Sequence, residues 1–398
     1  MAHWRTAMRP ELQDIVDEVS RVLRKPATLE DRRFNLVAFG SHDDGIDEVR
    51  QHTILRRQST AEVRSWFEQF GIADSDVPVR IPSSPEHGVL GRLCLPARWH
   101  GVTYGYLWLL DPDEEIDDDA LPELLDLAGR AGAMLAQQAR VRDDLGYKLR
   151  DLLSADPEIA DRAAGEIDDD GLITRGTPVA VVELRVAAAG PFPVNLSQLP
   201  RSVLVSTADD HATLLVPVGS PGSSPQDTGT TPARDVAERL LVSTVESHAT
   251  ARSAELVAGI GAPRPDLAHA RGSWQEARLA ARVAQAVPAL RPVAGWPELG
   301  VYRLLGCGSD STLAGAVLDH AVLRLLDHGD GDLIATARAY LDHAGNVQQT
   351  AAALNVHRQT VYYRLERIEQ VTGLDLARGD QQLLLHLGLT LAPLLTSR

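Results

Sequence analysis

The residue types best suited to a specific chemical task lie in one short stretch near the C-terminal end of the sequence. Arg358 and Gln359 stand side by side there, and further polar and aromatic residues follow them at helical spacing: Tyr362, Tyr363, Glu366 and Arg367. In the major groove of DNA, Arg can donate two hydrogen bonds to guanine and Gln can pair with adenine. This composition favours the reading of base pairs over catalysis.

Two helices that meet at a tight turn must position these side chains. Such a helix-turn-helix needs a small residue where the two helix axes nearly touch, and Ala351, with Ala352 and Ala353, supplies it. Four residues after Ala351 the backbone must accept a positive φ, which Asn355 can adopt at modest cost. Six residues further, Val361 points back into the hydrophobic seam, followed by Leu365 and Ile368. The spacing therefore predicts helices over 347–354 and 357–371.

Each outward residue of the second helix then receives an expected role. Arg358 and Gln359 are the candidate base-reading residues, because the N-terminal part of a recognition helix enters the major groove. His357 and Thr360 lie at the helix start, where free backbone N–H groups favour phosphate. Tyr363, Arg364 and Arg367 are expected to contact the DNA backbone. The complete predicted DNA-binding set is His357, Arg358, Gln359, Thr360, Tyr362, Tyr363, Arg364 and Arg367.

Charge sets a limit on how such a unit could bind. The 398 residues include 39 Lys and Arg and 55 Asp and Glu, a net charge of −16, which argues against a protein that coats nucleic acid by charge alone. Between 345 and 370 three Arg face two Glu, so one unit is barely basic and should bind weakly. We therefore expect double-stranded promoter or operator DNA as the partner and a homo-oligomer, a dimer or larger, as the binding species.

The remaining sequence divides into zones with different patterns of expected helices and strands. Residues 1–140 show a first helix and then short strands separated by Pro and Gly, which indicates an α+β layer; connecting helices follow to about 153. Residues 154–308 alternate strands and helices and predict an α/β domain. Residues 311–398 are helical throughout, with helices expected over 313–326, 333–343, 347–354, 357–371 and 381–395. The strands expected in the first two zones are 34–40, 77–81, 89–95, 102–110, 178–186, 202–206, 212–218 and 255–260, and the helices are 121–153, 231–252 and 266–286.

At this point the sequence resembles a known family. The stretch from Leu333 to Leu395, with Asn355-Val356-His357-Arg358-Gln359-Thr360-Val361-Tyr362-Tyr363-Arg364-Leu365, is similar to the helix-turn-helix of the PucR/CdaR-like bacterial transcriptional regulators. Residues 255–261 and 299–305 resemble that family's middle domain, a degenerate relative of the diguanylate cyclase (GGDEF) fold, and the first zone resembles a GAF-type sensor. The resemblance implies a multidomain α+β regulator whose upstream domains sense a small-molecule effector or hold the oligomer together.

Enzymatic activity is not expected. The cyclase reaction needs a Gly-Gly-Asp/Glu-Glu-Phe hairpin, and the corresponding tip reads Ala208-Asp209-Asp210-His211-Ala212, without the glycine pair. The acidic run 111–119 is interpreted as a solvated loop whose last carboxylates start a helix. No cofactor, catalytic residue or metal site is predicted, because His42, His52, His87 and His100 lack ligand spacing, and Cys94 and Cys307 lie 213 positions apart.

Three alternatives remain open at the level of sequence. The aromatic residues around the strands of the first zone (Trp66, Phe67, Phe70, Trp99, Tyr104, Tyr106 and Trp108) can form a packed core or line an effector pocket. The helical end can dock a protein instead of DNA, which would make the chain an interaction scaffold. A nucleotide-processing enzyme would require a phosphate site that we do not find. With no secretory core near the first residues and no apolar run of spanning length, we expect a cytoplasmic protein.

Overall fold

The computed structural model describes residues 10–40, 47–186, 199–200, 202–208, 210–247 and 256–396. The chain forms two compact units, one of residues 1–258 with 263–274 and one of residues 259–262 with 275–398. Within the described ranges no helix is long and apolar enough to cross a membrane. The domain boundaries expected from the sequence stay a prediction.

The first sheet is antiparallel and has the strand order β2-β1-β5-β4-β3. Four of its strands lie where the sequence predicts them. The fifth, β1, was not predicted, because its polar residues Thr28 and Glu30 hide the strand pattern although both are buried. The strand bounds are β1 Ala27–Asp31, β2 Leu36–Phe39, β3 Val79–Ile81, β4 Arg92–Trp99 and β5 Val102–Leu110.

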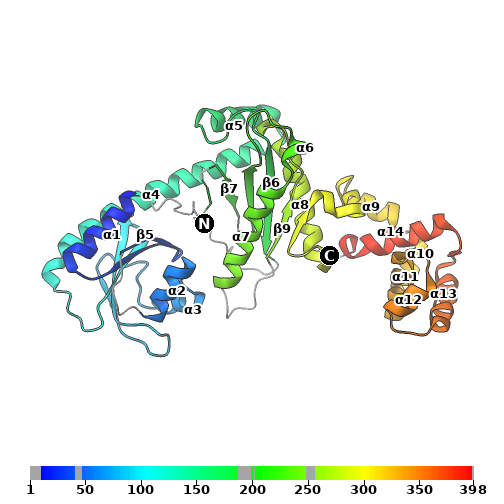
Figure 1. Ribbon diagram of the computed structural model, residues 1–398, viewed down its shortest axis with the longest axis horizontal. Coiled ribbons are helices and arrows are strands. Elements are labelled where there is room, and N and C mark those ends of the chain that lie inside the picture. The colour runs from blue at the N-terminus through cyan, green and yellow to red at the C-terminus, as the bar shows by residue number, and fades with distance from the viewer. Residues whose placement is uncertain are drawn as a thin grey trace. The chain divides into compact units, whose positions relative to one another are not determined.

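Helices cover both faces of this sheet (Figure 1). On one face α1 (Pro10–Leu23) and the first half of α4 (Leu121–Leu152) bury an aliphatic core. On the other face α2 (Glu48–Arg56) and α3 (Ala61–Glu68) enclose an aromatic core that contains Phe67 and Trp108. Helices α2 and α3 were not predicted, because α2 is mostly polar and both helices are short. Side-chain caps from Asp47 and Thr60 start them.

The acidic loop after β5 differs from its prediction at one residue. Asp111 is buried, and its carboxylate accepts from Lys25 Nζ at 2.9 Å and Arg80 Nη1 at 2.8 Å. The interpretation of this run as a fully solvated loop was therefore wrong for Asp111. Asp117, by contrast, caps the short 3-10 helix η1 (Asp118–Ala120) that precedes α4, as expected.

Helix α4 is a single helix of 32 residues that packs on both sheets of its unit. Its first half approaches β4 so closely that a Cβ on Gly132 would lie 2.5 Å from the Arg98 carbonyl oxygen. Its second half reaches β7, where a Cβ on Gly146 would lie 3.2 Å from the Val205 carbonyl oxygen. A side chain at Gly132 would push the helix away from β4, whereas one at Gly146 would require a shift of a few tenths of an ångström at β7.

The second sheet has the strand order β10-β9-β6-β8-β7, with β6 antiparallel to β8 and β7-β8 forming the predicted hairpin. Asp209 of the predicted tip lies outside the described residues, and the Asp210 carboxylate bonds the His211 Nδ1 at 2.7 Å. The elements of this region are α5 Pro157–Asp169, β6 Val179–Val186, β7 Leu204–Thr207, β8 His211–Pro217, α6 Pro225–Thr228, α7 Thr231–Ser247, β9 Leu256–Ile260, η2 Leu267–His269, α8 Ala270–Ala286, η3 Pro288–Leu290, β10 Val293–Gly295 and η4 Trp296–Gly306.

The C-terminal residues form six helices, the last five of which surround one apolar core. A single helix predicted over 313–326 was wrong: the chain breaks at Leu318, and Asp319 caps a new helix by accepting from the Ala321 N–H at 2.8 Å. The others match their predictions within a few residues. Their bounds are α9 Asp310–Val317, α10 His320–Asp327, α11 Gly331–Asp342, α12 Val347–Ala353, α13 Arg358–Thr372 and α14 Gly379–Leu395.

Candidate nucleic-acid interface

The turn between α12 and α13 has the geometry that the sequence predicts. Asn355 adopts a φ of 54°. The Asn355 N–H donates to the Ala352 carbonyl at 3.2 Å, and the Val356 N–H donates to the Ala351 carbonyl at 3.0 Å. These two bonds form a Schellman motif, which satisfies the last carbonyls of α12 and turns the chain sharply into α13. Asn355 is thus the residue that separates the two helices.

A continuous apolar seam fixes α13 on its inner side. Val361, Leu365 and Ile368 are buried in the same core as Ala351. The other two alanines of α12, Ala352 and Ala353, are exposed. The predicted seam is therefore confirmed, and of the three alanines only Ala351 lies at the close approach of the two helices.

The opposite side of α13 is exposed and polar. Tyr362 and Tyr363 are 58% and 70% exposed. Four further side chains of this face are exposed as well: Arg358, Gln359, Glu366 and Arg367. Arg358 forms no hydrogen bond or ion pair with any residue that the structure describes, while Arg367 donates to the neighbouring Gln370 at 3.1 Å. The N-terminal end of the helix thus presents unengaged donors, as base reading requires.

The first residues of α13 combine a cap with a polar surface. His357 is the N-cap, and its Nδ1 accepts from the Gln359 N–H at 3.3 Å. Its side chain is exposed, whereas Thr360 is half-buried. The backbone N–H groups of this first turn are the groups available to bind a phosphate.

Arg364 behaves differently from the other predicted residues. Its side chain turns toward α11, where the Nη2 forms an ion pair with the Asp332 carboxylate and the Nη1 lies 3.3 Å from Thr336 Oγ1. Only 18% of the Arg364 side chain is exposed. The sequence gives no means of finding this pair, since Asp332 lies 32 positions upstream and reads as an ordinary acidic residue in a first helical turn.

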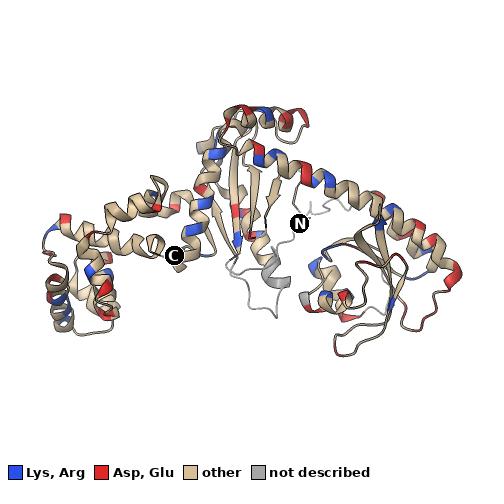
Figure 2. Cartoon of the chain, turned by 180° about the vertical axis from the view of Figure 1, so that it is seen from behind, with Lys and Arg blue, Asp and Glu red and all other residues tan. Residues whose placement is uncertain are grey.

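Charge is mixed over the whole helical region. Figure 2 shows Lys and Arg interspersed with Asp and Glu on the C-terminal helices, without a continuous basic segment. The Glu369 carboxylate is directed to the chain after α13, where its Oε1 accepts from the Leu376 N–H at 2.8 Å. With Arg364 paired internally, the outward face offers Arg358 and Arg367 beside Glu366, so electrostatic attraction to DNA from a single unit is small.

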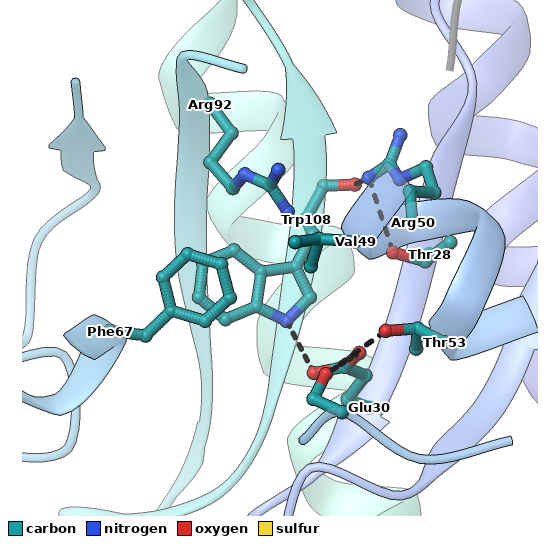
Figure 3. Close-up of a pocket in the computed structure, with 9 residues that line it drawn as sticks. Thr28, Glu30, Val49, Arg50, Thr53, Phe67, Arg92 and Trp108 are labelled. Atoms are coloured by element: carbon teal, nitrogen blue, oxygen red, sulfur yellow. Dashed lines mark hydrogen bonds between the residues drawn. The ribbon is translucent and has the colours of Figure 1, made fainter. Parts of the chain in front are cut away.

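A second cluster of buried polar residues lies under α2 and α3, against the first sheet (Figure 3). The Glu30 carboxylate accepts from Trp108 Nε1 at 3.0 Å and from Ser59 Oγ at 3.1 Å. Burial raises the pKa of Glu30 to about 7, although these bonds and the nearby arginines oppose the shift. Arg92 forms an ion pair with Asp47 and lies 5.0 Å from the centre of the Phe67 ring.

Arg50 is the unusual member of this cluster. Its guanidinium is buried and donates only to uncharged oxygens: the Pro26 carbonyl at 3.0 Å, the Trp108 carbonyl at 3.0 Å and Thr28 Oγ1 at 3.2 Å. Burial lowers the pKa of Arg50 to about 9, and the nearby positive charge of Arg92 lowers it further, while Asp47 and Glu30 oppose the shift. No described carboxylate lies within ion-pair distance of Arg50. The adjoining cavity has about 10 Å³ of free volume, room for a single water molecule. In this conformation the aromatic layer packs as a core, without room for a ligand larger than water.

Within the described ranges, no group of three His, Cys, Asp or Glu side chains comes together in a way that could hold a metal ion. Cys94 is buried and Cys307 is exposed, and both are free thiols.

Comparison with known proteins assigns the class. The PucR C-terminal helix-turn-helix domain matches residues 333–391, which include α11, α12 and α13. The GGDEF-like domain matches residues 192–283. The exposed α13 face and these two matches define a DNA-binding transcriptional regulator rather than an enzyme.

Full-length relatives give the same result. The DNA-binding transcriptional activator AdeR of Bacillus subtilis is 21% identical, covering 96% of this chain and 92% of its own length. The proline-responsive transcriptional activator PutR of the same organism is 23% identical, covering 96% of each chain. The Carbohydrate diacid regulator of Escherichia coli is 42% identical over 18% of each chain. The resemblance predicted from the sequence is thus confirmed: the chain carries a PucR-type helix-turn-helix domain and a GGDEF-like domain, and over most of its length it is similar to transcriptional activators.

Proposed function

We propose that α13 is the recognition helix and that Arg358 and Gln359 read base edges in the major groove. His357, Thr360, Tyr362, Tyr363 and Arg367 then contact the sugar-phosphate backbone on either side. The observation that carries this proposal is the exposed polar face of α13, whose Arg358 guanidinium has no partner among the described residues. Bidentate donors at the N-terminal end of a helix match the geometry by which helix-turn-helix proteins read DNA.

The small charge of this face supports binding as an oligomer. Two arginines beside Glu366 neutralise few phosphates, so one unit is too weak for specific occupancy at physiological salt. A homodimer or a larger assembly places two recognition helices on two half-sites of an operator, and the contributions of the two helices then combine.

The regulatory part of the proposal concerns the N-terminal region. We assign residues 1–140 to a GAF-like sensor domain, 154–308 to a GGDEF-like domain and 311–398 to the DNA-binding domain of a cytoplasmic protein. A small-molecule effector acts on the sensor domain, and α4 transmits the change because it packs on β4 and on β7. The relative PutR is a proline-responsive activator, which supports an effector of metabolite size for this chain.

The Glu30 cluster is the candidate place for the effector. Arg50 offers a buried cation without a carboxylate partner among the described residues, and an anionic group on the effector would supply one. Since the cavity has room for one water molecule, binding must move α2 or α3 outward. Trp108 donates to Glu30 in this cluster, so its fluorescence should report that movement.

A salt-titrated binding assay tests the proposal. Full-length protein is mixed with DNA flanking its own gene and with a scrambled duplex of equal length, with and without cell extract as a source of effector. A complex specific for the flanking DNA, whose affinity falls steeply with log salt, supports the regulator with α13 as its reading element. Equal binding to both duplexes, or none, would contradict it and favour a helical region that docks a protein.

A further inference from the structure

Arg364 carries the only ion pair that joins α13 to another helix within the described ranges. The Nη2 pairs with Asp332 at the start of α11, and the Nη1 lies 3.3 Å from Thr336 Oγ1 one turn later. Thr336 is fully buried, and its hydroxyl donates to the Asp332 carbonyl at 2.7 Å. Arg364 therefore contacts one turn of α11 at two points, one of which is rigidly embedded in the core.

The apolar seam alone leaves the rotation of α13 loosely defined. Hydrophobic burial of Val361, Leu365 and Ile368 is favourable but not directional. A charge-assisted hydrogen bond from a planar guanidinium depends strongly on direction. The pair between Arg364 and Asp332 therefore selects one rotation of α13 about its own axis.

A second fixed point lies at the C-terminal end of α13. Arg324 of α10 donates to the Thr372 carbonyl in the last turn, next to Gly373 with its φ of 76°. A cation there also interacts favourably with the helix dipole. Among the described residues, no side chain of another helix bonds to the first turn of α13, from which Arg358 and Gln359 project. The direction of the Arg358 and Gln359 side chains is therefore set by Arg364, which lies six and five residues further along the helix.

We propose that Arg364 is a positioning residue that orients the recognition helix through Asp332, rather than a residue that contacts DNA phosphate. This inference rests on the proposed role of α13 and revises one of the eight residues that the sequence assigns to DNA. A phosphate contact would require Arg364 to leave Asp332, which is 71% exposed and would then present an unpaired carboxylate beside the DNA.

The two roles predict opposite signs for Asp332. If Arg364 positions the helix, Asp332→Asn weakens specific binding because the orienting partner is lost. If Arg364 contacts phosphate, Asp332→Asn strengthens binding, because it removes a competitor for the guanidinium and a negative charge near DNA. Asp342→Asn is the matched control, since Asp342 lies at the other end of α11 and pairs with His386 of α14.

The experiment measures affinity of the full chain for specific and scrambled duplexes over a range of salt. We expect Asp332→Asn and Arg364→Gln each to lower specific affinity about three- to tenfold. The double variant should be no weaker than the weaker single variant, because both changes remove the same interaction. The salt slope should stay unchanged in both, whereas Arg367→Ala lowers it by about 0.9.

Two further variants separate positioning from simple loss of folding. The exchange Asp332→Arg with Arg364→Asp restores the pair in reverse and should recover part of the specific affinity. Arg364→Lys keeps the charge and any phosphate contact but loses the planar fork, so it should resemble Arg364→Gln. Thermal unfolding of each variant identifies any variant that fails to fold. In that case Asp332→Asn, which changes an exposed side chain, decides between the two roles of Arg364: weaker specific binding supports positioning, and tighter binding supports a phosphate contact.

Each result has a defined meaning. A shallower salt slope for Arg364→Gln together with tighter binding by Asp332→Asn would overturn the positioning role and leave the recognition helix intact. If Arg358→Ala has no effect while the wild type still binds specifically, the proposed contacts of α13 fail instead. The two failures are therefore distinguishable in one set of titrations.

Discussion

The indole Nε1 of Trp108 donates a hydrogen bond to the Glu30 carboxylate at 3.0 Å, and both side chains are buried. The bond joins β5 to β1 inside the aromatic core of the first sheet. It places a titratable group, whose pKa burial raises to about 7, on the side of the sheet that α2 and α3 cover.

Glu30 should make the stability of the N-terminal region depend on pH. Its pKa rises from 4.5 to about 7 on folding, so the folded state binds the proton more tightly. The resulting stabilisation is complete below about pH 4.5 and is lost as pH rises through 7. In urea unfolding followed by Trp fluorescence, the stability of wild type relative to Glu30→Gln should fall by on the order of 2–3 kcal/mol from pH 5 to pH 8. Glu62→Gln, at an exposed site on α3, is the control, and parallel curves for wild type and Glu30→Gln would refute the assignment.

Two glycines of α4 should respond in opposite directions to the same substitution. Gly132→Ala puts a methyl group 2.5 Å from the Arg98 carbonyl oxygen and should destabilise the protein by about 1–3 kcal/mol. Gly129→Ala has open space around the new methyl group and should stabilise the helix by up to ~1 kcal/mol. Thermal unfolding by circular dichroism measures both, and equal effects would mean that α4 does not pack tightly on β4.

The end of α11 contains an avoidable strain. Ala344 has a φ of 51°, a left-handed conformation that disfavours any residue with a Cβ. Ala344→Gly should therefore stabilise the C-terminal helices by about 1 kcal/mol. Ala335→Gly, at an exposed position inside the same helix, should destabilise them by a similar amount. A lower unfolding temperature for Ala344→Gly would show that the turn has another conformation in solution.

Arg358 should dominate sequence discrimination. Arg358→Ala should lower affinity for the specific duplex by about 1–3 kcal/mol and relax the preference at one base-pair position. Selection of bound sequences from a randomised duplex pool measures both effects. Arg142→Ala removes an exposed arginine from α4 and controls for a general loss of positive charge. Undiminished discrimination by Arg358→Ala would transfer the reading role to Gln359 or to another element.

Local patterns made the DNA-binding region predictable. The positions of Ala351, Asn355 and Val361 are set within one short segment, so the turn, the seam and the outward face follow from spacing alone. The pairing of Arg364 with Asp332 could not be predicted in the same way, because it joins two helices across 32 positions and many exposed acids could have served.

The same limit on prediction from sequence applies more strongly to the first sheet. The polar residues Thr28 and Glu30 concealed β1, and their burial depends on Arg50 and Trp108, which approach from distant parts of the chain. Similarly, Asp111 reads as one acidic residue among many, yet Lys25 and Arg80 neutralise it in the interior. Partners that lie far apart in sequence leave no periodic signal.

Helix α4 has a mechanical property that follows from its two close contacts. At 1.5 Å per residue its 32 residues form a rod of about 48 Å, and Gly132 and Gly146 lie about 21 Å apart along it. If α4 twists about its axis at one sheet, it turns by the same angle at the other sheet. If α4 tilts slightly at one sheet, its far end is displaced by a distance that grows with the length of the rod. Because both glycines lie close against a strand, the helix has little room to move toward either sheet, and a displacement imposed at one sheet is carried along the rod to the other.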